Sequence, residues 1–175
     1  QGRFVFGTIH EPAKGPKQKA GQFLRLDADL TLHELPLPRV AIANSVAFSP
    51  DGSTMYFCDS LQKKIERCDY GDRIGDVSTF VDLTSLEGGE PDGTAVDGEG
   101  GVWNAQWGGS RVVRYAPDGN IDFILPMPVL QPTCVAFGGE NLNLLAVTSA
   151  RVGLSDEALQ QQPQAGHLFI FQTDV

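Results

Sequence analysis

The amino-acid sequence predicts an all-β protein of four-stranded antiparallel sheets, and three observations support this class. The 175 residues include 20 Gly and 11 Pro, which is typical of many tight turns rather than of long helices. Apolar and polar residues alternate in short runs such as "KIERC" and "VVRYA", as half-exposed strands require. The third observation is an internal repeat, in which three segments of the chain align with one another.

The repeated segments begin at Asn44, Pro91 and Pro132, which lie 47 and then 41 residues apart. They open with "NSVAFSPDG", "PDGTAVDGEG" and "PTCVAFGG". Each segment has an apolar strand, an acidic or glycine-rich turn and a second strand, usually followed by a third and a fourth. Repeats of about 40–50 residues with four strands are typical of the blades of a β-propeller. We therefore predict a β-propeller of four-stranded antiparallel blades.

The repeat defines the expected strands in chain order. Segments 2–9, 21–28 and 30–37 are predicted to be the last three strands of a first blade that lacks its inner strand. The next two blades are predicted to be complete, with short apolar inner strands that suit the crowded axis of a propeller. Their strands are predicted at Ser45–Ser49, Thr54–Asp59, Lys64–Asp69 and Val77–Leu83, and then at Gly93–Asp97, Gly101–Gln106, Arg111–Ala116 and Ile121–Leu125.

The last part of the chain supplies one more incomplete blade. Segments 133–138, 144–150 and 166–172 are predicted to be its first three strands, without a fourth. Between them, Leu154 to Pro163 is predicted to form a short helix, because Ser155 can cap it, acids fill its first turn and proline ends it. Such an insertion either covers a binding mouth or is a surface loop without a role.

Incomplete blades at both ends give roughly fourteen strands, whereas a closed ring of four blades needs about sixteen. The chain is then either a small propeller with irregular ends or the later portion of a larger propeller, and we favour the second interpretation. Residues 1–175 are accordingly predicted to form a single partial propeller domain, an open arc of about four blades. A missing segment or self-association would close the arc.

Charge and cysteine content narrow the classes of partner and location. A net charge of −9 disfavours nucleic acid and anionic membrane surfaces, and it favours a cation. No apolar run approaches the ~20 residues that cross a bilayer. The three cysteines, Cys58, Cys68 and Cys134, cannot all pair with one another. We therefore expect buried free thiols and a cytoplasmic location, with a Cys58–Cys68 disulfide across a hairpin as a less favoured alternative.

Six motifs run through nearly the whole chain: "GRFVFGT", "NSVAFSPDGSTMYFCDS", "PDGTAVDGEGGVWNA", "GGSRVVRYAPDG", "PTCVAFGG", and "TSAR" followed by "QPQAGHLFIF". Together they resemble the regucalcin/gluconolactonase (senescence marker protein) family of six-bladed propellers. The resemblance implies an enzyme that hydrolyses sugar lactones or related esters. It also implies one divalent metal ion, held at one mouth of the axial channel.

The resemblance further implies which residues form the site. The metal ligands of the family are a glutamate, an asparagine and an aspartate, and Asn44 and Asp92 match the last two. The glutamate, and an arginine–asparagine segment that binds substrate, have no counterpart in this chain. Glu11, in the loop "HEPAKGPKQKAG", matches a second substrate-binding acid.

The residues themselves suit this chemistry. Asn44 and Asp92 each precede an expected inner strand in successive blades, so we expect them side by side at one mouth. A neutral oxygen and a carboxylate suit Ca²⁺, Mg²⁺ or Mn²⁺, whereas Zn²⁺ is less favoured because no Cys/His cluster with ligand spacing is present. Such an ion would polarise the lactone carbonyl while Asp92 takes a proton from water.

Other interpretations of these residues remain open. A carboxylate between Pro91 and Gly93 also makes an ordinary Asx-type turn. Similar turn acids are expected to be solvated, and they are Asp51, Asp97 and Asp118. The alternative functions are a propeller that binds calcium or a partner without catalysis, and a purely structural repeat.

Aromatic residues and histidines are weaker candidates for the site. Trp103, Trp107 and Phe137 are expected to pack in the interior. Trp107 could line the pocket, and His10 could reach the mouth, although a histidine on the surface is the more favoured interpretation.

Overall fold

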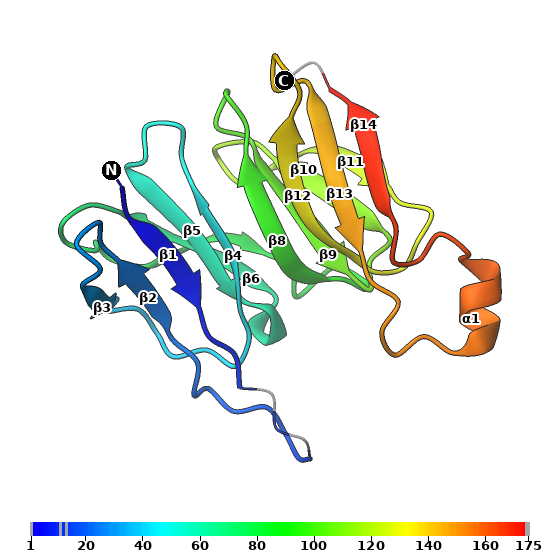
Figure 1. Cartoon of the computed structure of the whole chain (residues 1–175), viewed down its shortest axis with the longest axis horizontal. Coiled ribbons are helices and arrows are strands. Elements are labelled where there is room, and N and C mark those ends of the chain that lie inside the picture. Colours follow the sequence, from blue (N-terminus) through cyan, green and yellow to red (C-terminus); the bar gives the residue numbers. More distant parts are fainter. Residues whose placement is uncertain (1, 11, 13, 174–175) are drawn as a thin grey trace.

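Four antiparallel sheets stand side by side in an arc (Figure 1). The structure is a computed structural model and describes residues 2–10, 12 and 14–173. The first sheet consists of β1 (Phe4–Gly7), β2 (Phe23–Leu26) and β3 (Leu32–Glu34), and the second of β4 (Ala43–Phe48), β5 (Thr54–Asp59), β6 (Lys64–Asp69) and β7 (Ser78–Asp82). The third consists of β8 (Glu90–Val96), β9 (Val102–Trp107), β10 (Arg111–Tyr115) and β11 (Ile121–Pro126), and the fourth of β12 (Pro132–Gly138), β13 (Leu144–Ser149) and β14 (Leu168–Gln172).

These sheets confirm the predicted all-β class and the arc of about four blades. The two middle sheets have four strands each, and the first and last have three. Strands follow one another in chain order within every sheet, so each sheet is an antiparallel meander. The first strands of the last three sheets are β4, β8 and β12, and β8 contacts both of the others along the inside of the arc. They are therefore the inner strands that the repeat predicts.

The inner strands begin earlier than predicted. Asn44 already belongs to β4 and Asp92 to β8, whereas the turn-like sequence predicts that both precede their strands. The reason is that both strands carry a register shift close to these residues, with ladder pairing on either side of an irregular step. The sequence shows the turn-forming residues of that step but not the pairing upstream of it.

Apolar side chains fill the spaces between neighbouring sheets. The layer between the second and third sheets buries Ala47, Tyr56, Ile65, Phe80, Val81, Leu83, Val102, Val113 and Tyr115. Between the third and fourth sheets, the rings of Trp103 and Phe137 meet edge to face with centroids 5.9 Å apart, which confirms that both are packing residues. Each large buried side chain contributes roughly 1.5–3 kcal/mol, so these layers fix how the sheets stand relative to one another.

The cysteines are free, and two of the three are buried as expected. Cys58 and Cys68 do not face each other, because the ladder between β5 and β6 pairs Cys58 with Ile65 and Cys68 with Met55. Cys134 is exposed rather than buried. It lies on β12, the last inner strand among the described residues.

The predicted helix is present as α1 (Asp156–Gln161). Ser155 caps it, and its Oγ accepts a hydrogen bond from Ala158 N over 3.2 Å. Figure 1 shows α1 and the loop after β1 along the same edge of the molecule, the edge at which β8 begins. No helix in the described part of the chain has the length and apolar character needed to cross a membrane.

Candidate active site

Asn44 and Asp92 are in hydrogen-bond contact across the boundary between the second and third sheets. Asn44 Nδ2 donates to Asp92 Oδ1 over 2.6 Å and to Ser60 Oγ over 3.4 Å. The other end of the amide is also held, because Asn44 Oδ1 accepts from Ser45 N over 3.1 Å. The predicted proximity of these two residues, 48 positions apart in the sequence, is therefore confirmed.

β4 and β8 each carry a bulge-like irregularity beside these side chains. The ladder between β4 and β5 shifts register between Asn44 and Ala47, and the ladder between β8 and β9 shifts between Pro91 and Thr94. Within the first bulge Ser45 has a φ of 58°, in the left-handed region that residues with a side chain seldom adopt. Bulges re-aim side chains and strained backbone concentrates at functional sites, so this local geometry suits a binding or catalytic site.

Gly93 allows β8 to pass very close to β12 directly after Asp92. A Cβ atom at Gly93 would lie 2.4 Å from Cys134 Sγ and 2.7 Å from Cys134 Cα, where atoms overlap. The glycine of the Pro-Asp-Gly sequence is thus required by the crowding of inner strands and not only by a turn.

Side chains of the second sheet hold the backbone that carries Asp92. Ser60 Oγ donates to Pro91 O over 2.7 Å, and Ser45 Oγ donates to Asp92 O over 2.6 Å. The thiol of Cys58 adds a longer bond of 3.5 Å to Pro91 O. The Pro91–Asp92 corner is therefore tied across the boundary between two sheets rather than supported by its own sheet alone.

Burial raises the pKa of Asp92 to about 6. Loss of hydration is the largest cause, and the negative charge of Glu90 adds to it. Hydrogen bonds from Asn44 and from the backbone N–H of Gly93 act in the opposite direction but do not outweigh burial. A carboxyl with this pKa is mostly ionised at neutral pH yet close to its titration range, which is where a general base works best.

A pocket of about 290 Å³ includes this pair. It is lined by Ile9, Lys17, Ile42, Asn44, Ser60, Glu90, Pro91, Asp92, Trp107 and Val152. The lining residues come from the loop after β1, the inner edges of the second and third sheets, and the segment before α1. Apolar walls with a few convergent polar groups are typical of sites for small molecules.

Of the remaining candidates from the sequence, Trp107 lines the pocket and His10 is not among the lining residues. His10 Nδ1 accepts from Gln18 N over 2.9 Å and so stabilises the loop after β1. Glu11 lies outside the described residues, and its contact with substrate stays a prediction.

The motifs in the sequence do not point to Ser60 or Asp59 as site residues. Asp59 is buried, and its two carboxylate oxygens accept from the backbone N–H groups of residues 41 and 42, each over 3.1 Å. It thereby fixes the segment that leads into Asn44. Strand pairing would have indicated both residues. The ladder between β4 and β5 pairs Asn44 with Cys58, and Asp59 and Ser60 are the two residues that follow Cys58.

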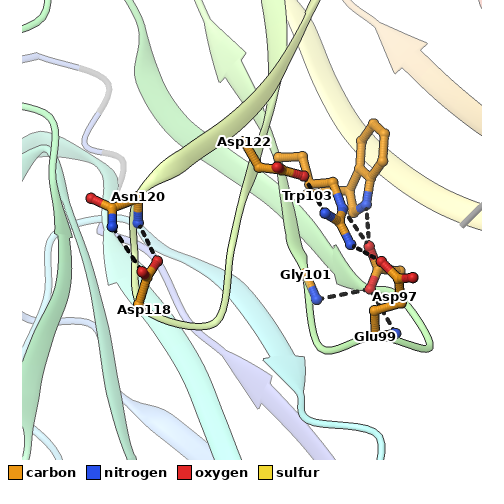
Figure 2. Close-up of polar contacts among 8 residues, drawn as sticks. Asp97, Glu99, Gly101, Trp103, Asp118, Asn120 and Asp122 are labelled. Atoms are coloured by element: carbon orange, nitrogen blue, oxygen red, sulfur yellow. Dashed lines mark hydrogen bonds and ion pairs between the residues drawn. The ribbon is translucent and has the colours of Figure 1, made fainter.

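Asp97 is buried, contrary to the expectation that acids in such turns are solvated. Figure 2 shows Gly101 and Trp103 directed at its carboxylate, with Glu99 nearby. Gly101 N and Trp103 Nε1 each donate over 2.8 Å, and Arg114 Nε donates over 2.7 Å. Burial alone would raise the pKa of Asp97, but these hydrogen bonds outweigh it and hold the pKa below its ordinary value. The expectation failed because the ion-pair partner comes from another strand, β10.

Asp51 and Asp118 are exposed turn acids, as expected. Asp118 Oδ1 accepts from Asn120 N over 3.0 Å, a contact visible in Figure 2. Hydrogen bonds, that from the Ser49 hydroxyl first, lower the pKa of Asp51 to about 2.

The donors at this site fit a hard divalent cation. The Asp92 carboxylate and the Asn44 amide oxygen are ligand types that Ca²⁺ and Mg²⁺ prefer. The raised pKa of Asp92 indicates a negative charge that a cation would stabilise. The amide nitrogen faces Asp92 here, so the amide must turn over to present its oxygen. Within the described ranges no three His, Cys, Asp or Glu side chains group closely enough to hold a metal. An ion bound by these two residues would need water or other oxygen donors to complete its coordination.

The family model described as the SMP-30/Gluconolactonase/LRE-like region matches residues 1–151. The chain belongs to this family. Two lactonases are similar to it in sequence. L-arabinolactonase of Azospirillum brasilense is 55% identical over 174 residues, covering 98% of the chain and 57% of the relative. The 6-deoxy-6-sulfogluconolactonase of Pseudomonas putida is 36% identical over 176 residues, covering 99% of the chain and 59% of the relative.

A solved structure of the same family supports the architecture. The calcium-binding protein regucalcin from Agrobacterium tumefaciens superposes on 97% of the chain with a TM-score of 0.88 and 35% sequence identity. The matched region is 57% of that protein. The chain thus spans less than two thirds of the length of these relatives. These similarities confirm the family and the fold that the motifs predict.

Proposed function

We propose that the protein hydrolyses a sugar lactone, with Asp92 as the general base and with Asn44 and Asp92 as ligands of one divalent metal ion. The observation that carries this proposal is the 2.6 Å contact between the two side chains inside a pocket. The pKa of about 6 for Asp92 supports its role as a base. Membership of the gluconolactonase-like family and similarity to two sugar lactonases support the substrate class.

In the proposed reaction Asp92 and Asn44 have different roles. Asp92 takes a proton from a water molecule as the water oxygen bonds to the lactone carbonyl carbon. In the metal-free protein Asn44 Nδ2 holds Asp92 Oδ1, and with its amide turned over Asn44 would present its oxygen to the ion instead. The carbon–oxygen bond of the ring then breaks, and the departing oxygen receives the proton from Asp92 to give a hydroxy acid. A divalent ion, when bound, polarises the carbonyl and stabilises the negative charge on its oxygen.

The pocket walls suggest how the substrate is held. A volume of about 290 Å³ is close to the smallest of the ~300–1,000 Å³ typical for small-molecule sites, so we propose a substrate with one sugar unit. Trp107 and Val152 offer apolar surface to the C–H face of such a ring. Glu11 would bind substrate hydroxyls from the loop after β1. We place the protein in the cytoplasm, because its three cysteines are free.

A second candidate function is binding of calcium without catalysis. The similarity to a regucalcin described as a calcium-binding protein favours it. The two functions differ in one measurable property, because only the first turns over a lactone.

The test is hydrolysis of a panel of sugar lactones by the full-length protein, with a chelator or with Ca²⁺, Mg²⁺, Mn²⁺ or Zn²⁺. We expect metal-dependent turnover, and we expect Asp92→Asn to lower it by about 10²–10⁴-fold while the fold is retained. Asp118→Asn makes the same change at an exposed turn and should keep full activity. Full activity in folded Asp92→Asn protein would refute the assignment of Asp92 as the general base. Turnover without metal would refute the role of the divalent ion.

A further inference from the structure

Ser60 lies at the boundary between the second and third sheets and is only 5% exposed. It follows β5 and opens the short 3₁₀ helix η1 (Ser60–Gln62). Its backbone N donates to Ile42 O over 3.1 Å, which anchors the residue beside the start of β4. The position of its hydroxyl is therefore set by the main chain.

The hydroxyl of Ser60 contacts both halves of the candidate site. It donates to Pro91 O over 2.7 Å, in the main chain directly before Asp92. It also accepts from Asn44 Nδ2 over 3.4 Å. A hydroxyl can do both at once, because it has one donor and two acceptor lone pairs. One side chain thus links the amide on the second sheet to the backbone that carries the carboxylate on the third.

Neighbouring groups hold the same corner but do not replace this link. Burial raises the pKa of Cys58 to about 12, so its thiol stays protonated and remains a weak donor to Pro91 O at 3.5 Å. Ser45 and Asn104 bind the next carbonyl, Asp92 O, over 2.6 and 3.2 Å. These bonds keep the main chain in place, and we therefore expect the protein to fold without the Ser60 hydroxyl.

We propose that Ser60 is a positioning residue for lactone hydrolysis, which holds Asn44 and the Pro91–Asp92 corner in one fixed arrangement. The inference rests on the proposed function of Asp92. Without the hydroxyl, Pro91 O keeps only the thiol as its donor from the second sheet, and the Asn44 amide loses an acceptor. Water then enters beside Asp92, and the pair spends less time in the reactive arrangement. Small displacements of catalytic groups have large effects on rate.

The kinetic test compares Ser60→Ala and Ser60→Thr in the full-length protein. Loss of one hydrogen bond should lower kcat about tenfold with little change in KM, and threonine should restore most of the rate because it keeps the hydroxyl. Ser49→Ala is the matched control, since it removes a hydroxyl from the far end of the same hairpin, where Ser49 bonds Asp51 and Thr54. It should lower Tm and leave kcat unchanged.

A second readout does not depend on turnover. The side-chain amide of Asn44, followed by ¹⁵N NMR without metal, should exchange its hydrogens with water faster in Ser60→Ala, because Nδ2 loses an acceptor and water enters beside the pair. Ser60→Thr should reverse the change.

An unchanged kcat in folded Ser60→Ala protein overturns the proposal, and so does a threonine variant no more active than the alanine variant. Ser60→Cys, with a weaker donor of similar size, should lie between serine and alanine, and it replaces alanine as the test if that variant does not fold. Activity of Asp92→Asn separates the two proposals. Full activity there refutes the general base, while the hydrogen exchange of the Asn44 amide still decides whether Ser60 orders the pair.

Discussion

Asp92 lies near the start of β8, and Asp97 lies just after its end. Their surroundings shift the pKa values of the two carboxyls in opposite directions. Arg114, Trp103 and a backbone N–H surround Asp97, and its pKa lies below the ordinary value. The side chain that binds Asp92 is the neutral amide of Asn44, and the pKa of Asp92 is raised to about 6.

The difference shows how compensation separates a structural carboxylate from a reactive one. Removing a carboxylate from water costs free energy. At Asp97 a cation and several hydrogen-bond donors offset this desolvation cost. At Asp92 the hydrogen bonds offset it only in part, so the proton affinity of the carboxylate is raised and the group is suited to proton transfer or cation binding. Their sequence contexts, "EPDGT" and "AVDGEGG", do not distinguish these cases.

The largest effect on stability is expected for Asp97→Asn. Breaking a buried ion pair should cost about 3 kcal/mol of unfolding free energy, while hydrolysis per folded molecule stays near wild type. Because the pKa of Asp97 is lowered, its contribution is present above the unfolded-state value of 3.8 and is lost as pH falls through the lower folded value. Denaturant unfolding at several pH values should show the difference shrinking in acid.

The control for this comparison is Glu99→Gln. Glu99 binds the same guanidinium over 2.8 Å, but its side chain is 69% exposed. Its loss should cost less than about 1 kcal/mol. Equal destabilisation by the two substitutions would contradict the view that burial makes Asp97 the structural partner of Arg114.

Asp92→Asn should have a smaller effect on stability, and of opposite sign. The folded-state pKa of Asp92, about 6, lies above the ordinary 3.8, so its protonation stabilises the fold at low pH and this contribution is lost as pH rises through 6. In metal-free buffer the variant should therefore melt at a higher temperature than wild type at pH 8, and at a similar temperature near pH 4. A lower Tm at pH 8 would contradict the raised pKa.

Asn44→Ala is expected to have the smallest effect of these substitutions, and it acts on the pKa of Asp92. Because the hydrogen bond from Asn44 lowers the pKa of Asp92, its removal should raise that pKa further and move the acid limb of the activity profile to higher pH. Metal affinity should also weaken, and excess metal should restore part of the rate. Asn120→Ala removes a comparable amide, which donates to the exposed Asp118 over 2.8 Å, and should change neither property.

The sequence by itself determined the fold class, the strand order, the capped helix and the proximity of Asn44 and Asp92. Alternation, turn residues and repeat spacing are local signals, and they carry this information because inner strands of successive repeats must meet at the axis. The family resemblance added the proposed roles of both residues.

Only the tertiary structure decided which carboxylate has its burial offset by a cation, where the inner strands are irregular, and which side chains support the site. Arg114 lies 17 positions from Asp97, and Ser60 lies 31 positions from the carbonyl of Pro91. Burial and pKa depend on such distant neighbours, which are brought together by sheet packing and not by the local pattern. That is why two Asp-Gly pairs in one blade could not be told apart in the sequence, although one aspartate forms a buried ion pair and the other lies in the candidate active site.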